Sequence, residues 1–531
     1  MINASDSSTR KIGTFLTSNI VTIIFFIFVV AGFIASPGIP ASGLLNEVMS
    51  RFFRNGLLVV ALIIPVMAGL GLNFGIVVGA LAAVLAIIPI RYWGIGGIGG
   101  LVLCFLLALP LALLFGYFTG KLYNRTRGQE MIAGIIVSFF AEGLFLIFVL
   151  FMIGGVIPVA AGHPMIIPAT QDGVPVPGVG VRSAFDMGLH AQHPVALRDP
   201  YHVPGLSNAL DFLWQVDFLI ALAVLSIGVL AFVLIRRVLA NRNPGIEKAP
   251  KWAFILRCSV CVLFLLIALH GLLTPPGGVV VLLPEFLRFG GVRGILIPGS
   301  PFAGANRIPV MTGLVILAFC LFTYYFTKTK LGQDCRSVGQ SQHIANASGI
   351  NVDRTRIIAT MISTVLGAWG MIIFLQNMGT VSTYTAHRQI GMFSVAALLV
   401  GGATAAKAGV KNAILGLLLF HSMFVVSPGI GRFFFGDEGV AEYTRTFMVY
   451  GVIGLSLGLH VWKTAKAARD KDRLDDLDPP PLDGGGDGGG GDGGGGGGGK
   501  PLGAAQGAHG SKDDPLATIA AELIHGKNTA D

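Results

Sequence analysis

Charged residues are scarce in this chain of 531 residues: Asp, Glu, Lys and Arg make up 12% of it, against 53% hydrophobic residues. Soluble domains carry about 25% charged residues, so the composition excludes an ordinary soluble protein. The apolar runs are continuous over about 20 residues rather than alternating, which argues against a membrane β-barrel. The composition therefore predicts an all-α, polytopic transmembrane bundle of about 10–12 spans, some of them broken or re-entrant.

Cysteine pairs and catalytic constellations are also lacking. The five cysteines give no disulfide framework and no zinc-type spacing, and Cys258 and Cys261 are interpreted as isolated thiols in an apolar run. There is no nucleophile with a base, no pair of catalytic carboxylates and no cofactor fingerprint. We therefore expect a chain with no catalytic site, no metal and no cofactor of its own. The net charge of +9 is not gathered on an aromatic-rich basic face, so nucleic acid is not expected as a partner.

About twelve apolar segments follow one another along the chain. They lie near 18–36, 57–71, 74–90, 97–118, 131–157, 214–235, 252–273, 309–327, 357–377, 391–405, 411–428 and 447–462. The first is interpreted as an uncleaved span rather than a signal peptide, because the run is long and the sequence after it is only weakly cleavage-like. An even number of spans places both termini on the same side.

The basic residues indicate which side that is. With both termini inside, the inner loops hold 18 basic residues before the tail and the outer loops hold 11, all arginine, while every lysine falls inside. Because Lys and Arg accumulate in cytoplasmic loops, we predict a multi-pass plasma (bacterial inner) membrane protein with both termini in the cytoplasm.

This topology divides the chain into parts. Residues 1–17 form a cytoplasmic N-terminus, 18–463 the transmembrane domain, and 464–531 a disordered tail whose Gly/Asp-rich run cannot bury enough apolar surface to fold. Two long loops, 158–213 and 274–308, are expected outside, as a cap over the bundle. The four histidines of the first loop are interpreted as solvated residues rather than metal ligands.

The polar segment from Lys328 to Arg356 separates two apolar runs. A polar stretch of that length must lie outside the hydrocarbon, and its five basic residues favour the cytoplasmic side. Its small residues, among them Gly339, Ala345 and Gly349, indicate a docking element rather than a plain linker.

Three further places combine polar residues with apolar spans. Asn73 lies among glycines at 67–83; it either breaks a helix, capping the next one beside a cavity, or makes a helix–helix hydrogen bond or tight turn. Glu130 stands where a span begins and is interpreted as a helix N-terminal charge, whereas Glu142 lies deeper, either facing a pathway or near the outer surface.

The third place is the stretch 374–391, which joins two spans on the predicted outer side. Gln376 and Asn377 offer donors and acceptors to a polar ligand, as do Tyr384, His387 and Arg388, although a solvated loop explains the last two equally well. Asn73, Glu142, Gln376 and Asn377 are the candidate residues of a substrate pathway.

The segment 331–352 resembles the cytoplasmic loop of permease subunits of ABC importers for simple sugars, nucleosides and branched-chain amino acids. The matching positions are Gly332, Gly339, Ala345, Gly349, Ile350 and Val352. Gln333, Ser337 and Ser341 depart from the Arg, Ala and Asn of the family pattern. The stretch 397–419 resembles the second Gly-rich segment of these permeases, and the resemblance covers about 50–460.

The nucleoside and simple-sugar branch is the more similar one around the first spans. The matching positions are Asn73, Gly75, Gly79, Gly128, Glu130 and Ile132. An acidic residue expected after Gly75 and an Asn expected near Ser138 are absent, which weakens a literal transfer of the substrate.

The resemblance implies a transmembrane permease that imports a small polar solute, with a simple sugar or a nucleoside favoured. It implies a separate ABC ATPase that binds ATP and Mg²⁺, an extracytoplasmic solute-binding protein, and a second permease, either a copy or a paralogue. Gly332, Gly339, Ala345, Gly349 and Ile350 would then belong to the loop that couples to the ATPase. The alternatives are a branched-chain amino acid permease, an ion-coupled secondary transporter and a membrane-embedded enzyme that acts on lipids.

Overall fold

The computed structural model describes most of the predicted transmembrane domain. The described residues are 20–34, 41–153, 155–159, 163, 165, 169–171, 174–176, 184–188, 205–211, 213–242, 250–273, 279–282, 294–297, 307–382, 386–404, 407–436, 439–440, 442–451, 453–455 and 458. The predicted N-terminal segment 1–17, the tail 464–531 and most of the two predicted external loops lie outside these residues.

Helices account for most of the described chain, which confirms the all-α class. They are α2 (Ile20–Ile34), α3 (Ala41–Ala61), α4 (Ile63–Met67), α5 (Ile76–Tyr92), α6 (Gly97–Arg125), α7 (Glu130–Met152), α8 (Phe218–Arg242), α9 (Lys251–Leu273), α10 (Val310–Phe326), α11 (Lys330–Gln340), α12 (Gln342–Ala347), α13 (Val352–Met378), α14 (Ala386–Val400) and α15 (Val410–Phe435). Residues 442–451 are helical as well.

Among the residues that the structure describes, seven helical segments are long and apolar enough to cross a membrane, and a bent pair could make an eighth. In that pair α10 meets α11 at an angle of 72°, because the apolar run ends at Phe326 and the polar segment turns away. Helices α2, α5 and α14 are apolar but shorter. The multi-pass architecture expected from the sequence is thus confirmed.

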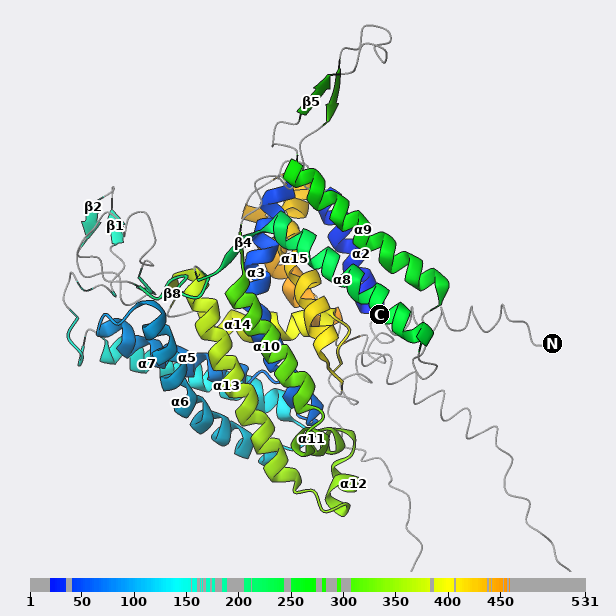
Figure 1. Cartoon of the computed structure of the whole chain (residues 1–531). Helices are drawn as coiled ribbons and strands as arrows, with labels where there is room; N and C mark the ends of the chain where they lie inside the picture. The colour runs from blue at the N-terminus through cyan, green and yellow to red at the C-terminus, as the bar shows by residue number, and fades with distance from the viewer. Residues whose placement is uncertain are drawn as a thin grey trace, which may run out of the picture. The chain divides into compact units, whose positions relative to one another are not determined.

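Helix α13 lies at the centre of the bundle, where it packs against α3, α5 and α6 (Figure 1). Small residues permit this close packing. A Cβ at Gly79 of α5 would lie 2.4 Å from the Thr364 carbonyl oxygen of α13, and one at Gly116 of α6 would lie 2.8 Å from the Met361 Cα. Both helices therefore approach α13 with backbone against backbone.

Helices α8 and α9 form a hairpin that packs mainly on itself. Their outward side chains are nearly all apolar and exposed, with Phe232, Leu263 and Trp252 among them. Such a surface suits lipid, since hydrocarbon solvates apolar side chains at no cost. Cys258 and Cys261 lie in α9, and all five cysteines are unpaired, as the sequence indicates.

Short antiparallel strand pairs lie at the helix ends remote from α11. They are β1 (Ala169–Gln171) with β2 (Val174–Val176), β3 (Ala184–Asp186) with β8 (Thr380–Ser382), β4 (Gln215–Asp217) with β7 (Arg307–Pro309), and β5 (Val279–Leu282) with β6 (Gly294–Ile297). The pair β4–β7 brings the first residues of α8 and α10 together, and the pair β3–β8 joins residues 184–186 to the segment that follows α13.

The second span begins sixteen residues earlier than predicted. The sequence places an outer loop before residue 57, but α3 already begins at Ala41. The charged residues that suggest a loop are accommodated within the helix. The Arg51 guanidinium pairs with Glu47 one turn away, at 2.7 Å, and lies 4.4 Å from the centre of the Phe424 ring.

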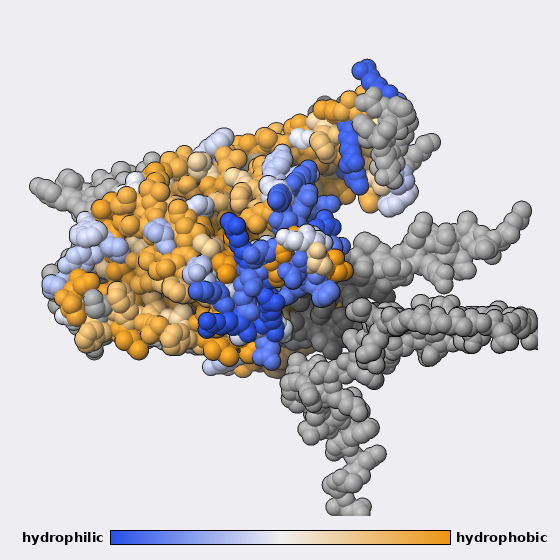
Figure 2. All heavy atoms as spheres, turned by 90° about the horizontal axis from the view of Figure 1, so that it is seen from below, coloured by the Kyte–Doolittle hydropathy of each residue, from blue (hydrophilic) through white to orange (hydrophobic). Residues whose placement is uncertain are grey.

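In the view from below (Figure 2), polar surface gathers mainly near the centre, and a smaller polar area lies at the upper right. Apolar residues cover much of the surface around the central patch. The polar segment forms α11 and α12 at this end of the bundle (Figure 1), and its exposed residues include Lys330, Arg336, His343 and Asn346. We call this the α12 end, and the end with strands β4 and β7 the strand end.

Candidate functional site

Three capping residues divide the polar segment into its helices. Thr329 accepts a hydrogen bond from the Gly332 amide and begins α11, Ser341 accepts from the Ile344 amide and begins α12, and Asn351 accepts from the Arg354 amide and begins α13. Ser, Thr and Asn are the residues preferred at such positions because their oxygens satisfy amides that have no partner within the helix. The docking element predicted from the sequence is therefore a helix–turn–helix unit with well-defined boundaries.

A small apolar cluster stabilises this unit. Val338 of α11, Ala345 of α12 and Val352 of α13 are buried together, and Ile350 packs against them. Gly349 has φ +81°, a left-handed conformation that glycine adopts without strain, and it ends α12. Burial raises the pKa of the Cys335 thiol in α11 to about 12.

Two glycines of α11 allow the polypeptide to approach itself closely. A Cβ at Gly332 would lie 1.9 Å from the Phe326 carbonyl oxygen, so a side chain there would prevent the turn from α10 into α11. A Cβ at Gly339 would lie 2.2 Å from the Met67 carbonyl oxygen at the end of α4. Gly69 faces it with φ +74°, and a Cβ there would lie 2.9 Å from the Gly339 Cα.

Because of this contact, α11 lies directly against the break in helical structure between α4 and α5. Helix α4 ends at Met67 and α5 begins only at Ile76, so residues 68–75 cross the bundle interior without continuous helix. The backbone there is held by single turns, such as the Leu70 amide on the Pro65 carbonyl. A displacement of α11 would therefore act on backbone that has few helical hydrogen bonds to resist it.

Asn73 lies inside this break, and its side chain is 2% exposed. Its amide oxygen accepts a hydrogen bond from the Tyr123 hydroxyl at 2.8 Å, and its amide nitrogen donates to the Ser363 hydroxyl at 3.3 Å. The helix break and the helix–helix hydrogen bond, alternatives in the sequence, are both present. The capping role is wrong: α5 begins after Gly75 with no side-chain cap.

Glu130 and Arg356 form an ion pair near the α12 end. Glu130 is the first residue of α7, as predicted, and it receives a hydrogen bond from the Arg356 guanidinium of α13. The same guanidinium donates to the Tyr123 carbonyl at 3.2 Å, so it lies beside the residue that binds Asn73. Arg356 is fully buried, and a buried charge of this kind is retained only with a partner. The ion pair and the bond to Tyr123 together connect α6, α7 and α13 near Asn73.

Glu142 lies in the middle of α7, and its side chain is 4% exposed. It lines a small cavity of about 30 Å³ together with Phe74 and Ser138. The Ser138 hydroxyl donates to the Phe74 carbonyl at 2.9 Å. Asn73 and Glu142 therefore belong to one region, around the residues that connect α4 and α5.

Gln376 and Asn377 lie elsewhere, in the last turn of α13 at the strand end. The Gln376 amide donates to the Asp211 carboxylate at 3.0 Å and accepts from the Leu210 amide, and the Asn377 amide donates to the other carboxylate oxygen at 2.9 Å. The Thr312 hydroxyl of α10 donates to Asp211 as well. The side chains of His387 and Arg388, and all of Tyr384, lie outside the described residues.

Asp211 is a residue that the sequence interpretation missed. It is 5% exposed and its carboxylate is held by neutral donors only. The sequence assigned it to an external loop because the apolar run begins near residue 214. The available signal was weak, since Asp211 is distinguished only by standing within the otherwise apolar segment from Leu210 to Trp214.

A cavity of about 230 Å³ opens beside Asp211. Its polar lining comes from four elements and consists of Asn46, Ser50, Asn208, Asp211, Gln215, Arg307 and Asn377. Amides, a hydroxyl and a carboxylate give it donors and acceptors in several directions. Its volume lies below the range of about 300–1,000 Å³ typical for drug-sized ligands, and so it suits a smaller polar molecule. We call it the strand-end cavity.

No group of three or more metal-binding side chains occurs among the residues that the structure describes. Of the four loop histidines only His163 is described, and its ring stacks on Tyr92 and contacts the Tyr92 carbonyl at 3.0 Å. His190, His193 and His202 lie outside the described residues, and the prediction that they are solvated stays a prediction.

The site geometry and the fold define a class of protein: a polytopic helical membrane protein with a polar helix–turn–helix unit at one end and a polar cavity at the other. Comparison with known proteins shows which families the chain is similar to. Residues 205–459 match the model of the branched-chain amino acid transport system / permease component family. This range contains α12, α13 and the strand-end cavity residues from Asn208 onward.

Curated relatives are named as permeases. The chain is 30% identical over 172 residues to a probable ABC transporter permease protein, YphD, of Escherichia coli K12, covering 32% of this chain and 49% of the relative. It is 34% identical over 159 residues to the nucleoside ABC transporter permease protein NupC of Lactococcus lactis, covering 29% and 49%, and 26% identical over 122 residues to NupB of that bacterium, covering 22% and 31%.

The matches span about half the length, or less, of these relatives. No solved structure matches the chain. The comparisons nevertheless confirm the resemblance stated from residues 331–352: the chain is similar to permease components of ABC transporters, including nucleoside permeases.

Proposed function

We propose that this chain is the membrane-spanning permease of an ABC importer for a small polar solute. The observation that carries the proposal is the contact between α11 and the break before α5. Gly339 lies with its backbone on Met67 and Gly69, while α12 presents an exposed surface on the other side of the same unit. A partner that moves α12 therefore moves the backbone next to Asn73.

The partner in this proposal is an ABC ATPase that docks on α12. Ile344 is a large hydrophobic side chain that is 66% exposed, and His343 and Asn346 beside it are exposed and polar. An apolar residue ringed by polar ones is typical of the centre of a docking surface. ATP and Mg²⁺ would be bound and hydrolysed by that separate subunit.

Transport in this proposal follows from two sites that open in turn. The solute, delivered by an extracytoplasmic binding protein, enters the strand-end cavity, where Asp211 and Asn377 meet it. Movement of α11 then changes the path of residues 68–75, around which Asn73, Ser138 and Glu142 lie. The Arg356–Glu130 pair would keep α7 and α13 together during this change. The α12 end is cytoplasmic in this proposal, and a second permease, identical or paralogous, completes the complex.

The solute class is a simple sugar or a nucleoside. Its support is the strand-end cavity, whose amides and hydroxyl suit a ligand with several hydroxyl groups, and the names of the two lactococcal relatives, both nucleoside permeases. The matching family model is named for branched-chain amino acids. An aliphatic side chain would require an apolar lining, and Met49, Phe218, Ile308 and Pro309 supply only part of one.

The proposal is tested with the chain reconstituted together with its ATPase and binding protein. We expect ATP hydrolysis to rise when the loaded binding protein is added, and the Gly339→Leu variant to lose this stimulation although it inserts normally. Gly454→Leu is the matched control, because a Cβ there meets nothing within 4 Å. Unchanged stimulation in Gly339→Leu would contradict the proposed coupling.

A further inference from the structure

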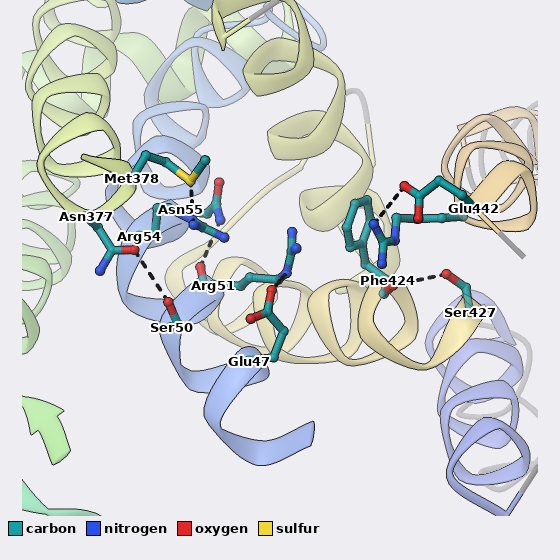
Figure 3. A network of polar contacts seen from close by, with 11 residues as sticks. Glu47, Ser50, Arg51, Arg54, Asn55, Asn377, Met378, Phe424, Ser427 and Glu442 are labelled. Atoms are coloured by element: carbon teal, nitrogen blue, oxygen red, sulfur yellow. Dashed lines mark hydrogen bonds and ion pairs between the residues drawn. The ribbon is translucent and has the colours of Figure 1, made fainter. Parts of the chain in front are cut away.

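Three partly buried arginines lie near one another next to the strand-end cavity. Arg51 and Arg54 lie on α3 (Figure 3), and Arg445 lies on the helical segment that follows α15. The guanidinium carbons of Arg51 and Arg445 lie 4.4 and 4.7 Å from the centre of the same ring, that of Phe424. The Arg54 guanidinium lies 5.4 Å from the centre of the Phe374 ring.

The position of Arg54 is unusual for a charge. The span that contains α3 and α4 runs from Ser42 to Met67, so Arg54 is near its midpoint. A charged side chain in the middle of a span is costly and normally faces a partner or a pathway. Arg51 and Arg54 also stand one turn apart on the same helix, where like charges repel.

The carboxylates among the described residues neutralise this charge only in part. Glu47 pairs with Arg51 at 2.7 Å and Glu442 pairs with Arg445 at 2.8 Å. Arg54 contacts the sulfur of Met378 and has no carboxylate partner in the part of the chain that the structure describes. Three positive charges therefore face two negative ones, and the excess belongs to Arg54.

Buried nitrogens without partners point to the same place. The Nε atoms of Arg54 and Arg445 and the Nδ1 atom of His421 are buried and make no hydrogen bond among the described residues. His421 is 1% exposed and lies close enough to Arg51 and Arg54 to be repelled by their charges. An unpaired buried polar atom costs free energy that a bound ligand can recover.

The arginine cluster and the strand-end cavity are adjacent. Ser50 and Asn377, which line the cavity, are joined by a hydrogen bond of 3.4 Å. Arg54 lies one turn of α3 beyond Ser50, and Met378, which it contacts, follows Asn377 in the chain (Figure 3). A molecule in the cavity could therefore extend one group towards the arginines.

We propose that the solute carries an acidic group, a carboxylate or a phosphate, which binds Arg51, Arg54 and Arg445 while its hydroxyl groups occupy the strand-end cavity. The solute class is then an acidic sugar or a phosphorylated sugar or nucleoside. Guanidinium groups bind both oxyanions through paired N–H donors, which explains arginine rather than lysine at these positions. This inference rests on the proposed import function and specifies its substrate.

The test uses the full-length chain in nanodiscs of neutral phosphatidylcholine and two pairs of probes. D-glucuronate is compared with D-glucose, and ribose 5-phosphate with ribose, by calorimetry and by the midpoint of thermal unfolding, up to about 10 mM. We expect the acidic member of at least one pair to bind and its neutral counterpart to bind at least tenfold more weakly. Equal behaviour of acid and neutral probes in both pairs would overturn the inference.

Variants then locate the binding. Arg54→Gln should weaken binding of the acidic probe by about 30-fold or more, because one partner of a desolvated charge pair is lost, and Arg54→Lys should recover only part of it. Arg445→Gln, at a side chain that is 26% exposed, provides a second variant that folds more readily. Arg257→Gln on the exposed face of α9 is the control and should bind normally. Binding retained in Arg54→Gln and Arg445→Gln would overturn the inference.

The headgroup of an anionic lipid carries the same kind of acidic group as the proposed solute, so a separate experiment distinguishes the two. If phosphatidylglycerol nanodiscs stabilise the wild type but not Arg54→Gln, while the soluble acids do not bind, a lipid headgroup occupies the arginines and the inference is wrong. Failure of the acidic-solute inference is distinct from failure of the proposed importer function. The ATPase stimulation that Gly339→Leu is expected to lose does not depend on the charge of the solute.

Discussion

At the scale of residues, Asp211 shows how the strand-end cavity is held together. Its carboxylate accepts hydrogen bonds from Gln376, Asn377 and Thr312, which come from α13 and α10. Each donor would lose its partner if the carboxylate were removed, while an amide would still accept from some of them.

We therefore expect Asp211→Ala to destabilise the protein by about 3 kcal/mol and Asp211→Asn by about half as much, since buried groups left unpaired cost about 1–3 kcal/mol. Thermal unfolding of the purified protein measures both. Equal stability of Asp211→Ala and the wild type would contradict a role for this carboxylate in joining α10 to α13.

Cys335 provides a second prediction at this scale. Burial raises its pKa to about 12, and the thiolate is the species that reacts with maleimides. A raised pKa means that the thiol stays protonated at pH 7.5, so we expect Cys335 to resist alkylation in the intact protein. An engineered Ser348→Cys, exposed at the end of α12, should react within the same time. Mass spectrometry of the labelled peptides distinguishes them, and rapid labelling of Cys335 at pH 7.5 would contradict the described packing of α11.

At the scale of elements, the proposed role of the short helix α12 depends on its exposed side chains, above all Ile344. Ile344 is mostly exposed, so Ile344→Ser should change the thermal unfolding midpoint little. It should nevertheless weaken association with the ATPase by tenfold or more, because apolar anchors at the centre of an interface typically cost above 1 kcal/mol when truncated. Gly143→Ser on α7, where a Cβ meets nothing within 4 Å, is a control away from α12. Unaltered copurification of the ATPase with Ile344→Ser would exclude α12 as its docking element.

Elements are also where sequence and structure can be compared most closely. The predicted span 252–273 and the observed α9 differ by one residue, because a continuous apolar run bounded by charged or proline residues leaves little choice. The polar segment 328–356 was predictable because Thr329, Ser341 and Asn351 mark each helix start. The start of α3 was not, because Glu47 and Arg51 resemble loop residues until their pairing and the Phe424 ring are seen.

The candidate site was predictable only in pieces. Asn73, Glu142, Gln376 and Asn377 are conspicuous as polar residues in or beside apolar runs, and all four are buried or partly buried. That they form two separate regions follows from the packing of α7 and α13, which no local pattern contains. Asp211 and the Arg51–Arg54–Arg445 cluster depend on contacts between residues more than a hundred positions apart, as in the Gln376–Asp211 hydrogen bond.

At the scale of the whole molecule, the α12 end and the strand end are connected through the interior of the helix bundle. The α12 end has a docking unit that rests on the broken helix, and the strand end has a polar cavity beside an arginine cluster. An importer driven by ATP requires this separation, since the ATPase and the binding protein act on opposite sides of the membrane. A secondary transporter would require neither the docking unit nor a partner.

The most direct test of the central claim is uptake into proteoliposomes that contain the chain with its ATPase, with ATP enclosed and the binding protein outside. The radiolabelled probes are ribose, adenosine, ribose 5-phosphate and glucuronate. The account predicts that at least one accumulates only when ATP is hydrolysed, and that Gly339→Leu abolishes the accumulation. Accumulation driven by an ion gradient with the chain alone, unaffected by ATP or by Gly339→Leu, would contradict it.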